Sequence, residues 1–293
     1  MVIGRFAPSP TGPLHFGSLV AAVASYCDAK SQGGQWLLRI EDVDQTRHVA
    51  GASDDIIRTL QRYGFVWDGD IVFQSQRTAL YEASLARLHA RHLVYPCTCS
   101  RKEMADSSTR QGIEGAIYSG TCLQHPIKPD GNPAWRLKTT DTWISFEDRI
   151  QGTLRQNMAR EIGDFVIQRA DGLFSYQLAV VVDDAAQGVT HVVRGMDLLH
   201  STSRQIYLQQ LLGYATPVYA HIPLVMNTAG QKLSKQTLAR PLPEDNIQDT
   251  LIQALDFLPY LAAKPPAFTQ LSDLWSWAFE HWHLPPIKQS PRF

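Results

Sequence analysis

The turn between Arg5 and Leu19, RFAPSPTGPLHFGSL, places narrow limits on how this chain folds. It joins a short apolar run, which predicts a strand, to a helix-like run at residues 18–34, where Ser18 is a candidate N-cap. A strand that leads into a helix leaves backbone N–H groups and a positive dipole end facing an anion. The prolines fix the path, and Gly12 and Gly17 let a ligand approach the backbone. This turn therefore predicts an anionic nucleotide site.

Strand-like and helix-like segments alternate along much of the chain. Residues 35–44 form an apolar run that ends in acids and predicts a buried strand. Residues 52–65, with Ser53 as candidate N-cap, and residues 79–93 have helical spacing. This alternation predicts an α/β fold with a parallel sheet covered by helices. Later strands are expected at 134–139, 142–156 and 221–227. Residues 171–195 contain apolar runs, which end in Asp183 and Asp184. Helices are expected at 203–214 and 271–282.

Two lysines in the segment GQKLSKQ, residues 230–236, form a second candidate site. Lys232 and Lys235 follow an expected strand, and two ammonium groups on a loop suit a polyphosphate that gains charge during a reaction. Taken alone, such a loop is more simply a solvated basic segment. His15 in the first turn can donate a hydrogen bond to a phosphate oxygen without adding a permanent charge.

Together, the two segments resemble the two signature motifs of class I aminoacyl-tRNA synthetases, present here as HFGS and KLSKQ. The words LLRIEDVDQTR, YGFVWDGD, SYQLAVVVDD and VVRGMDLLHST are similar to the catalytic core of glutamyl-tRNA synthetases. The resemblance runs from Gly4 to about Arg240. It implies a Rossmann-like parallel sheet with a zinc-containing insertion and a small helical C-terminal segment.

The resemblance also implies a reaction and its residues. A glutamate α-carboxylate oxygen attacks the α-phosphorus of ATP, which is accompanied by Mg²⁺, and pyrophosphate leaves. The implied catalytic residues are His15, Lys232 and Lys235, and the implied ATP contacts are His15, Gly17, Ser18 and Lys235. The implied glutamate contacts are Arg5, Phe6, Ala7, Pro8, Ser9, Glu41, Tyr176 and Arg194.

The chemistry of these side chains suits glutamate. A guanidinium matches a carboxylate bidentately, so Arg5 and Arg194 are candidate partners of the substrate carboxylates. Glu41 can face the α-ammonium group, and the hydroxyl of Tyr176 can form a hydrogen bond. Without the resemblance, Glu41 is equally well an ion-pair partner of a nearby arginine, and Tyr176 a packing residue. No role is assigned to Asp44, Asp183, Asp184 and Asp197.

Three cysteines suggest a metal site. Cys97, Cys99 and Cys122 can hold a zinc ion by their thiolates, which leaves one place in a tetrahedral site. Generic zinc chemistry favours His125 for that place, whereas the family pattern implies Tyr118 and one structural Zn²⁺. The alternative is a loop of unliganded cysteines. Cys27, in an apolar helical run, is expected to pack rather than react.

Four segments follow from these assignments. We expect the first half of the catalytic domain at 1–96 and a zinc-binding insertion at 97–131. The rest of the insertion and the second half of the catalytic domain, with the KLSKQ loop, are expected at 132–240. A helical C-terminal segment without an anticodon-binding domain is expected at 241–293.

Composition limits the partners and the compartment. With 27 basic and 28 acidic residues, any RNA contact must use a local patch. The first residues do not read as a signal peptide, and no run of about 18 apolar residues predicts a membrane span. Four cysteines in 293 residues do not form a disulfide scaffold, so a reducing cytoplasm is expected. A monomer is expected as well.

Few residues follow Lys235, whereas full glutamyl-tRNA synthetases continue into helical anticodon-binding domains. The chain therefore resembles their short paralogues. This implies glutamate activation without tRNA, and then transfer of glutamate to the queuosine base at the wobble position of tRNA(Asp). The alternatives are a minimal synthetase that charges a tRNA 3′ end, one that uses another amino acid, a non-catalytic RNA-binding relative, and a small-molecule adenylyltransferase.

Overall fold

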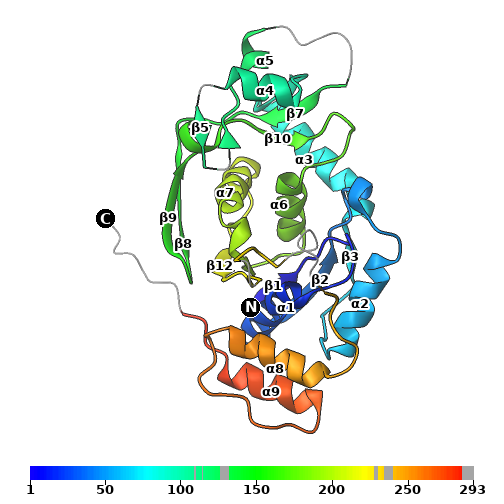
Figure 1. Cartoon of the computed structure of the whole chain (residues 1–293). Helices are drawn as coiled ribbons and strands as arrows, with labels where there is room; N and C mark the ends of the chain where they lie inside the picture. Colours follow the sequence, from blue (N-terminus) through cyan, green and yellow to red (C-terminus); the bar gives the residue numbers. More distant parts are fainter. Residues whose placement is uncertain (109, 114, 126–131, 228–229, 234–239, 286–293) are drawn as a thin grey trace.

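Parallel strands covered by helices form the centre of the molecule (Figure 1). The computed structural model describes residues 1–108, 110–113, 115–125, 132–227, 230–233 and 240–285. In the first half, β1 (Ile3–Phe6), β2 (Gln35–Ile40) and β3 (Val72–Phe73) are parallel and adjacent, with α1 (Phe16–Lys30), α2 (Ala52–Arg62) and α3 (Thr78–Ala90) after them in turn. Because connections between parallel strands are long, each crossover contains a helix.

The second half continues the parallel arrangement. Its elements are α6 (Tyr176–Ala186), β11 (His191–Gly195), α7 (Ser201–Leu212) and β12 (Val218–Ile222). Strand β12 lies between β11 and β8 (Trp143–Asp148), parallel to both, and β8 forms an antiparallel hairpin with β9 (Gly152–Asn157). Thr190, just before β11, accepts a hydrogen bond from the backbone N–H of Ile3 and so links the two sets of strands. The predicted α/β fold with a parallel sheet is confirmed.

A segment that packs partly on the second large core, and that adds a small hydrophobic cluster of its own, extends from one end of the molecule. It comprises β4 (Val94–Cys97), α4 (Arg101–Ser107), β5 (Gln111–Gly112), β6 (Gly115–Ala116), α5 (Thr121–Gln124), β7 (Ala134–Leu137) and β10 (Phe165–Gln168). Strands β4, β7 and β10 form an antiparallel sheet. Figure 1 shows α4 and α5 at the end of the molecule opposite the C-terminal helices.

Two C-terminal helices, α8 (Ile247–Phe257) and α9 (Leu271–His281), pack against α1. An aromatic cluster joins them to the sheet: Trp275 of α9 contacts Tyr26 and Phe65, and its indole N–H donates to the backbone carbonyl of Tyr63. This helical pair therefore belongs to the same hydrophobic core as β1 and β2. None of the described helices is long and apolar enough to cross a membrane.

Three of the element boundaries that differ from the sequence predictions have a clear physical reason. Helix α1 begins at Phe16 with His15 as its N-cap, so Ser18 is not the cap but lies within the first turn. Helix α2 begins directly after Gly51, whose positive φ of 76° makes the turn, so Ser53 is not its cap. Strand β12 spans 218–222 rather than 221–227, because Pro223 has no N–H to continue the ladder.

Candidate active site and candidate metal centre

The predicted ligand residues gather where the parallel strands end, which is where open α/β sheets bind ligands. The pocket at these strand ends measures about 540 Å³, within the range of roughly 300–1,000 Å³ that is typical of small-molecule sites. It lies between the turn after β1, the start of α1, and the segments that follow β11 and β12. Its lining includes Phe6, Pro8, Ser9, His15, Gly17, Ser18, Gly195, Asp197 and Lys232.

His15 is held against the start of α1. Its Nδ1 accepts a hydrogen bond from the backbone N–H of Ser18 at 3.3 Å, so the ring proton of the neutral imidazole is on Nε2. A Cβ added at Gly17 would lie 3.1 Å from Cε1 of this ring, so only glycine gives the ring its present position without displacement. The imidazole therefore caps the helix while its Nε2 can serve a ligand.

Lys232 reaches the same pocket from the other side. Its Nζ lies 2.5 Å from Oδ2 of Asp197, just after β11. Gly195 makes this arrangement possible, because an added Cβ there would lie 2.5 Å from Oδ1 of Asp197. The backbone N–H of Leu233 donates to the carbonyl of Val225 and fixes the near end of the loop. The other predicted lysine, at position 235, lies outside the described residues.

A smaller pocket of about 210 Å³ adjoins the first and shares Ser9 and Thr11 with it. Glu41, directly after β2, and Tyr176, the first residue of α6, line it. The backbone N–H of Glu41 donates to the carbonyl of Pro8 at 2.9 Å, which holds the ends of β1 and β2 together. Ala7 lies between the wall residues Phe6 and Pro8 in the chain and lines neither pocket.

Arg5 does not line either pocket but lies buried beside them. Its Nε is 3.3 Å from Oδ1 of Asp184 on α6. The same carboxylate accepts from Arg39 at 2.8 Å, and Arg39 also lies 3.3 Å from Glu41. Burial acts to raise the pKa of Asp184, but Arg5 and Arg39 outweigh it, and the pKa lies below its ordinary value. The pKa of Glu41 is raised, because burial outweighs Arg39 and Arg5.

Asp183, the neighbouring acid on α6, is a structural acceptor. Its carboxylate accepts from Gln74, Arg77 and Tyr81, at 2.9, 2.5 and 2.8 Å. Burial raises the pKa of Tyr81, and Asp183 raises it further, so this phenol stays a donor. The two consecutive acids therefore connect α6 to the end of β3 and to the strands β1 and β2.

Arg194, the second predicted arginine, is also buried rather than exposed in a pocket wall. Its Nη1 donates to the hydroxyl of Tyr176 at 3.3 Å, and its Nε donates to Nε2 of His221 at 3.0 Å. Burial raises the pKa of Tyr176, while the charge of Arg194 opposes this rise. The structure thus brings Arg5, Glu41, Tyr176 and Arg194 into one polar cluster beside the small pocket.

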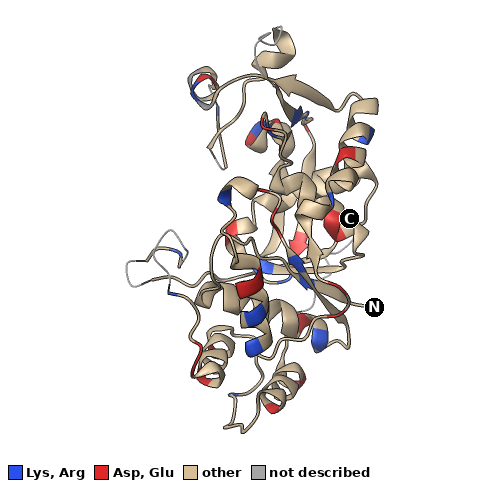
Figure 2. Cartoon of the chain, turned by 90° about the vertical axis from the view of Figure 1, so that its right-hand side faces the viewer, with Lys and Arg blue, Asp and Glu red and all other residues tan. Residues whose placement is uncertain are grey.

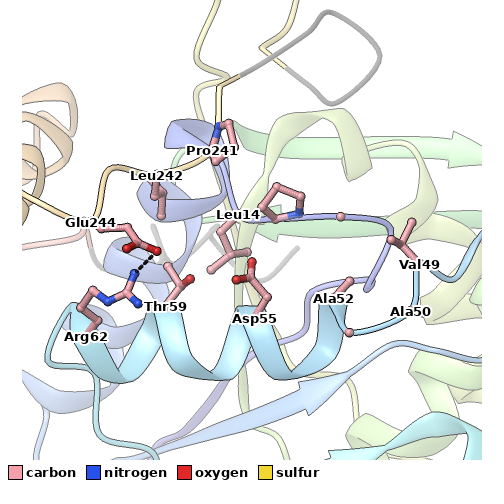
Figure 3. A pocket seen from close by; sticks show the side chains of 13 residues that line it. Leu14, Val49, Ala50, Ala52, Asp55, Thr59, Arg62, Pro241, Leu242 and Glu244 are labelled. Carbon is pink, nitrogen blue, oxygen red and sulfur yellow. Dashed lines mark ion pairs between the residues drawn. The ribbon is translucent and has the colours of Figure 1, made fainter.

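A third pocket, of about 410 Å³, lies behind the turn that holds His15 (Figure 3). Asp55, Thr59 and Arg62 point from α2 toward the segment 241–244, and Arg62 pairs with Glu244 at 3.0 Å. The backbone N–H of Leu242 donates to the carbonyl of Leu14. This pocket contains none of the predicted site residues, and its polar pair is exposed, so we do not assign it to the site.

The three predicted cysteine ligands come together at the far end of the molecule. The Sγ atoms of Cys97, Cys99 and Cys122 all lie within 4.8 Å of one another. The hydroxyl of Tyr118 lies 3.4 Å from Sγ of Cys97 and 3.3 Å from Sγ of Cys99. His125 is exposed and not part of this group. Three soft sulfur donors and one oxygen fit a tetrahedral zinc ion.

The electrostatics of this cluster favour the thiolate form of one cysteine and the protonated form of two of its neighbours. Burial acts to raise the pKa of Cys122, but hydrogen bonds from Tyr118 and from the backbone at Thr98 outweigh it and lower the pKa to about 7. Burial raises the pKa of Cys99 to about 11, and it also raises the pKa of Tyr118 well above the ordinary value of a tyrosine. One thiol is therefore close to its thiolate form even without a cation nearby, which favours metal capture.

Several residues of the site carry no signal in the sequence. Arg39, Asp148 and His221 are all buried and joined to distant residues by long-range contacts. The acids of SYQLAVVVDD stand out only because they interrupt an apolar run, which is the one sequence signal that points to Asp183 and Asp184. Nothing local distinguishes His221 from a packed core residue.

The fold and sequence were compared with known proteins. The model of the family "tRNA synthetases class I (E and Q), catalytic domain" matches residues 1–261. A relative from Thiobacillus denitrificans, glutamyl-Q tRNA(Asp) synthetase, is 53% identical over 99% of this chain and 96% of its own length. Its counterpart from Dechloromonas aromatica is 54% identical, over 95% of this chain and 93% of its own length.

Two solved structures share the fold. A glutamate-tRNA synthetase from Elizabethkingia anophelis has a TM-score of 0.67 and 28% identity, and the match covers 80% of this chain and 52% of that one. A glutamate tRNA ligase from Elizabethkingia meningosepticum has a TM-score of 0.75 and 23% identity, over 99% of this chain and 67% of that one. At the second identity the likeness concerns the fold alone.

Proposed function

The chain belongs to the class I tRNA synthetases for glutamate and glutamine, within them to the glutamyl-Q tRNA(Asp) synthetases, and we propose that it activates L-glutamate with ATP without tRNA. As a member of this family, it is a ligase. In the first step of the proposed reaction, an oxygen of the α-carboxylate attacks the α-phosphorus, the bond to pyrophosphate breaks, and glutamyl-adenylate forms.

The shared wall of the two pockets carries this proposal. Ser9 and Thr11 border both the 540 Å³ pocket and the 210 Å³ pocket. A nucleotide in the larger pocket and an amino acid in the smaller one would meet at this wall. Holding two anionic reactants in attack geometry is the main task of such a site, because positioning removes much of the barrier.

In the larger pocket, His15, Gly17 and Ser18 would contact the ATP phosphates. The N-terminus of α1 and the Nε2–H of His15 offer donors there without a full positive charge. Lys232, and Lys235 outside the described residues, would stabilise the leaving pyrophosphate. Lys232 would exchange its contact with Asp197 for a phosphate oxygen. Mg²⁺ would accompany ATP.

In the smaller pocket, Glu41 would face the α-ammonium and Tyr176 would donate through its hydroxyl. Ser9 and the strand end Phe6–Pro8 would form the wall next to the carboxylate. Arg5 and Arg194 would supply the positive charge for the carboxylates. Arg5 already has a carboxylate partner in Asp184, whereas Arg194 has none within the described part of the chain, so Arg194 is the stronger candidate for the side-chain carboxylate.

The second step would transfer glutamate to the queuosine base at the wobble position of tRNA(Asp). A hydroxyl oxygen of the cyclopentenediol would attack the activated carbonyl, an ester bond would form, and AMP would leave with the electrons of the broken bond. Unpaired bases are the part of RNA that proteins read best. Charged ribbon segments of both signs alternate along the molecule (Figure 2), so RNA contact would use a local patch.

The cysteine cluster would hold one structural zinc ion through Cys97, Cys99, Tyr118 and Cys122. When bound, zinc would cross-link the ends of a segment that buries little apolar surface of its own. The four residues would serve folding of this segment and not the chemistry at the pockets, which lie at the ends of other strands.

Mapping labelled glutamate on tRNA tests the acceptor. The purified chain is incubated with ATP, labelled glutamate and bulk tRNA from cells with and without queuosine. We expect label only on queuosine-containing tRNA(Asp), within the anticodon fragment after nuclease digestion. Label at the 3′ end would instead establish the alternative of a minimal synthetase. Periodate treatment alone cannot separate the two, because it destroys either vicinal diol.

A further inference from the structure

The buried arginines beside the two pockets differ in what neutralises them. Arg5 contacts Asp184, and Arg39 contacts both Asp184 and Glu41. Among the ion pairs of the residues that the structure describes, none includes Arg194, although it is buried to the same degree as Arg5. Because a buried charge is costly without a partner, this guanidinium is prepared for an anion from outside the chain.

His221 stands between Arg194 and the carboxylate of Asp148. Strands β11 and β12 are parallel, and their register places Arg194 directly opposite His221. On its other side, Nδ1 of His221 lies 2.6 Å from Oδ2 of Asp148 at the end of β8. The side chains of His221 and Asp148 are both 0% exposed. Three adjacent strands thus bring the carboxylate, the imidazole and the guanidinium into one line.

The donors and acceptors in this line fix the protons. Nε of an arginine can only donate, so Nε2 of His221 must accept and Nδ1 must carry the ring proton, which it donates to Asp148. Burial lowers the pKa of His221, the bond to Asp148 opposes this, and the charge of Arg194 lowers the pKa again. His221 is therefore neutral, and it holds Arg194 without cancelling its charge.

The remaining edges of the guanidinium set its direction. Nη2 donates to Oγ1 of Thr202 at 2.9 Å, and Thr202 lines neither pocket. Nη1 donates to the hydroxyl of Tyr176, which lines the smaller pocket. Nη1 carries a second N–H, and no other described residue accepts from it. That N–H is the one the arginine can offer to a ligand beside Tyr176.

We propose that Asp148 and His221 are positioning residues that keep Arg194 fully charged with its Nη1 edge toward the smaller pocket, and that they thereby set the preference for a carboxylate over an amide side chain. This inference rests on the proposed function. A carboxylate in direct contact would neutralise Arg194 and remove the distinction between glutamate and glutamine, which have nearly the same shape. The neutral imidazole avoids this.

Two amide variants of His221 separate positioning from stability. In His221→Asn, the amide nitrogen can take the place of Nδ1 and keep the bond to Asp148, but the side chain is too short to accept from Arg194. In His221→Gln, the carbonyl oxygen can reach the place of Nε2 and accept from Arg194, while the bond to Asp148 is lost. L-Glutamate and L-glutamine affinities are measured by titration calorimetry, together with ATP affinity and thermal unfolding.

We expect His221→Asn to weaken L-glutamate binding by about tenfold or more, and to narrow the ratio of glutamate to glutamine affinity, with ATP affinity unchanged. His221→Gln is expected to recover most of the glutamate affinity although it unfolds at a lower temperature than His221→Asn. Two results would overturn the inference. One is a glutamate affinity that is lower in whichever of the two variants unfolds at the lower temperature. The other is an unchanged glutamate affinity in His221→Asn.

Asp148→Asn tests the same hydrogen bonds, from Asp148 through His221 to Arg194, if His221→Asn does not fold. Oδ1 of Asp148 accepts the backbone N–H groups of Ile150, Gln151 and His221, so the asparagine must keep its oxygen there and turn its NH₂ toward Nδ1 of His221. The ring proton then moves to Nε2, and Arg194 loses its acceptor. Glutamate affinity should again fall about tenfold, and retained affinity would contradict the inference. A wild-type chain that binds no glutamate would overturn the proposed function and this inference together.

Discussion

The buried ion-pair cluster beneath the pockets (Arg5, Arg39, Asp183 and Asp184) and the cysteine cluster (Cys97, Cys99 and Cys122) show two ways of building a polar site. The first lies between strands and α6, next to the two large hydrophobic cores, and its charges pair with one another. The second has a core that consists of little more than the cluster itself. The first is therefore complete before a ligand arrives, whereas the second would be completed by a metal ion.

The largest effect on stability is expected from breaking the ion-pair cluster. Asp184→Ala removes the carboxylate partner of Arg5 and also the carboxylate that lies closest to Arg39. We therefore expect a loss of about 3–5 kcal/mol in the free energy of unfolding. Urea unfolding measures it. Asp171→Ala, which removes an exposed partner of Arg169, is the matched control and should cost less than about 1 kcal/mol. Similar losses in both variants would show that the cluster does not support the sheet.

The next effect concerns activity without a loss of fold. His15→Ala removes both the ligand donor and the N-cap of α1, so we expect glutamate-dependent adenylate formation to fall about 10²–10³-fold, with a loss of only about 1 kcal/mol in the free energy of unfolding from the missing cap. Gly17→Ala should lower the rate less, because its methyl group only displaces the imidazole. A rate for His15→Ala within a few-fold of the wild-type rate would remove this residue from the catalytic set.

A smaller, local effect is expected from the cysteine cluster. Cys99→Ala should reduce the bound zinc from about one ion per chain to almost none, measured by elemental analysis after purification without added metal. Protease cleavage within residues 97–125 should become faster, while urea unfolding of the sheet changes little. Cys27→Ala, in the apolar helix α1, is the control and should keep its zinc. Full zinc content in Cys99→Ala would exclude this ligand set.

The smallest effect is a pH dependence. Burial lowers the pKa of folded His221 below its ordinary 6.5, so the unfolded chain binds more protons between these two values, and stability falls as the pH falls through this range. His221→Asn removes this titration. The free energy of unfolding should therefore fall more steeply for the wild-type chain, by up to about 1.4 kcal/mol per pH unit below pH 6.5. Equal slopes would contradict a neutral, buried His221.

The sequence predicted the parts of the molecule that local patterns define. The strand at 35–40, the helix that follows the proline-rich turn and the meeting of three cysteines all rest on spacing within short segments. The expectation that Tyr118 rather than His125 faces the sulfur atoms came from family resemblance, and the tyrosine hydroxyl lies among them. Which of the residues at the pockets act on substrate stays a prediction.

The sequence could not predict the contacts that link distant segments. Asp184 meets Arg39 across 145 positions and Arg5 across 179, so no periodicity records these pairs. The run SYQLAVVVDD is apolar over most of its length, and such runs fit a buried strand or a buried helix equally well; it is α6. His15 is the N-cap because an imidazole nitrogen, like a hydroxyl oxygen, can accept a backbone N–H of the first turn, here that of Ser18.

The central claim is that the site at the strand ends is assembled before RNA binds. Exchange of labelled pyrophosphate into ATP, measured with purified chain, Mg²⁺ and a panel of amino acids without tRNA, tests it most directly. The account predicts exchange with L-glutamate, much less with L-glutamine, and none without amino acid. Exchange that appears only after tRNA is added would contradict it, because the two pockets would then not be sufficient to join the carboxylate to the α-phosphorus.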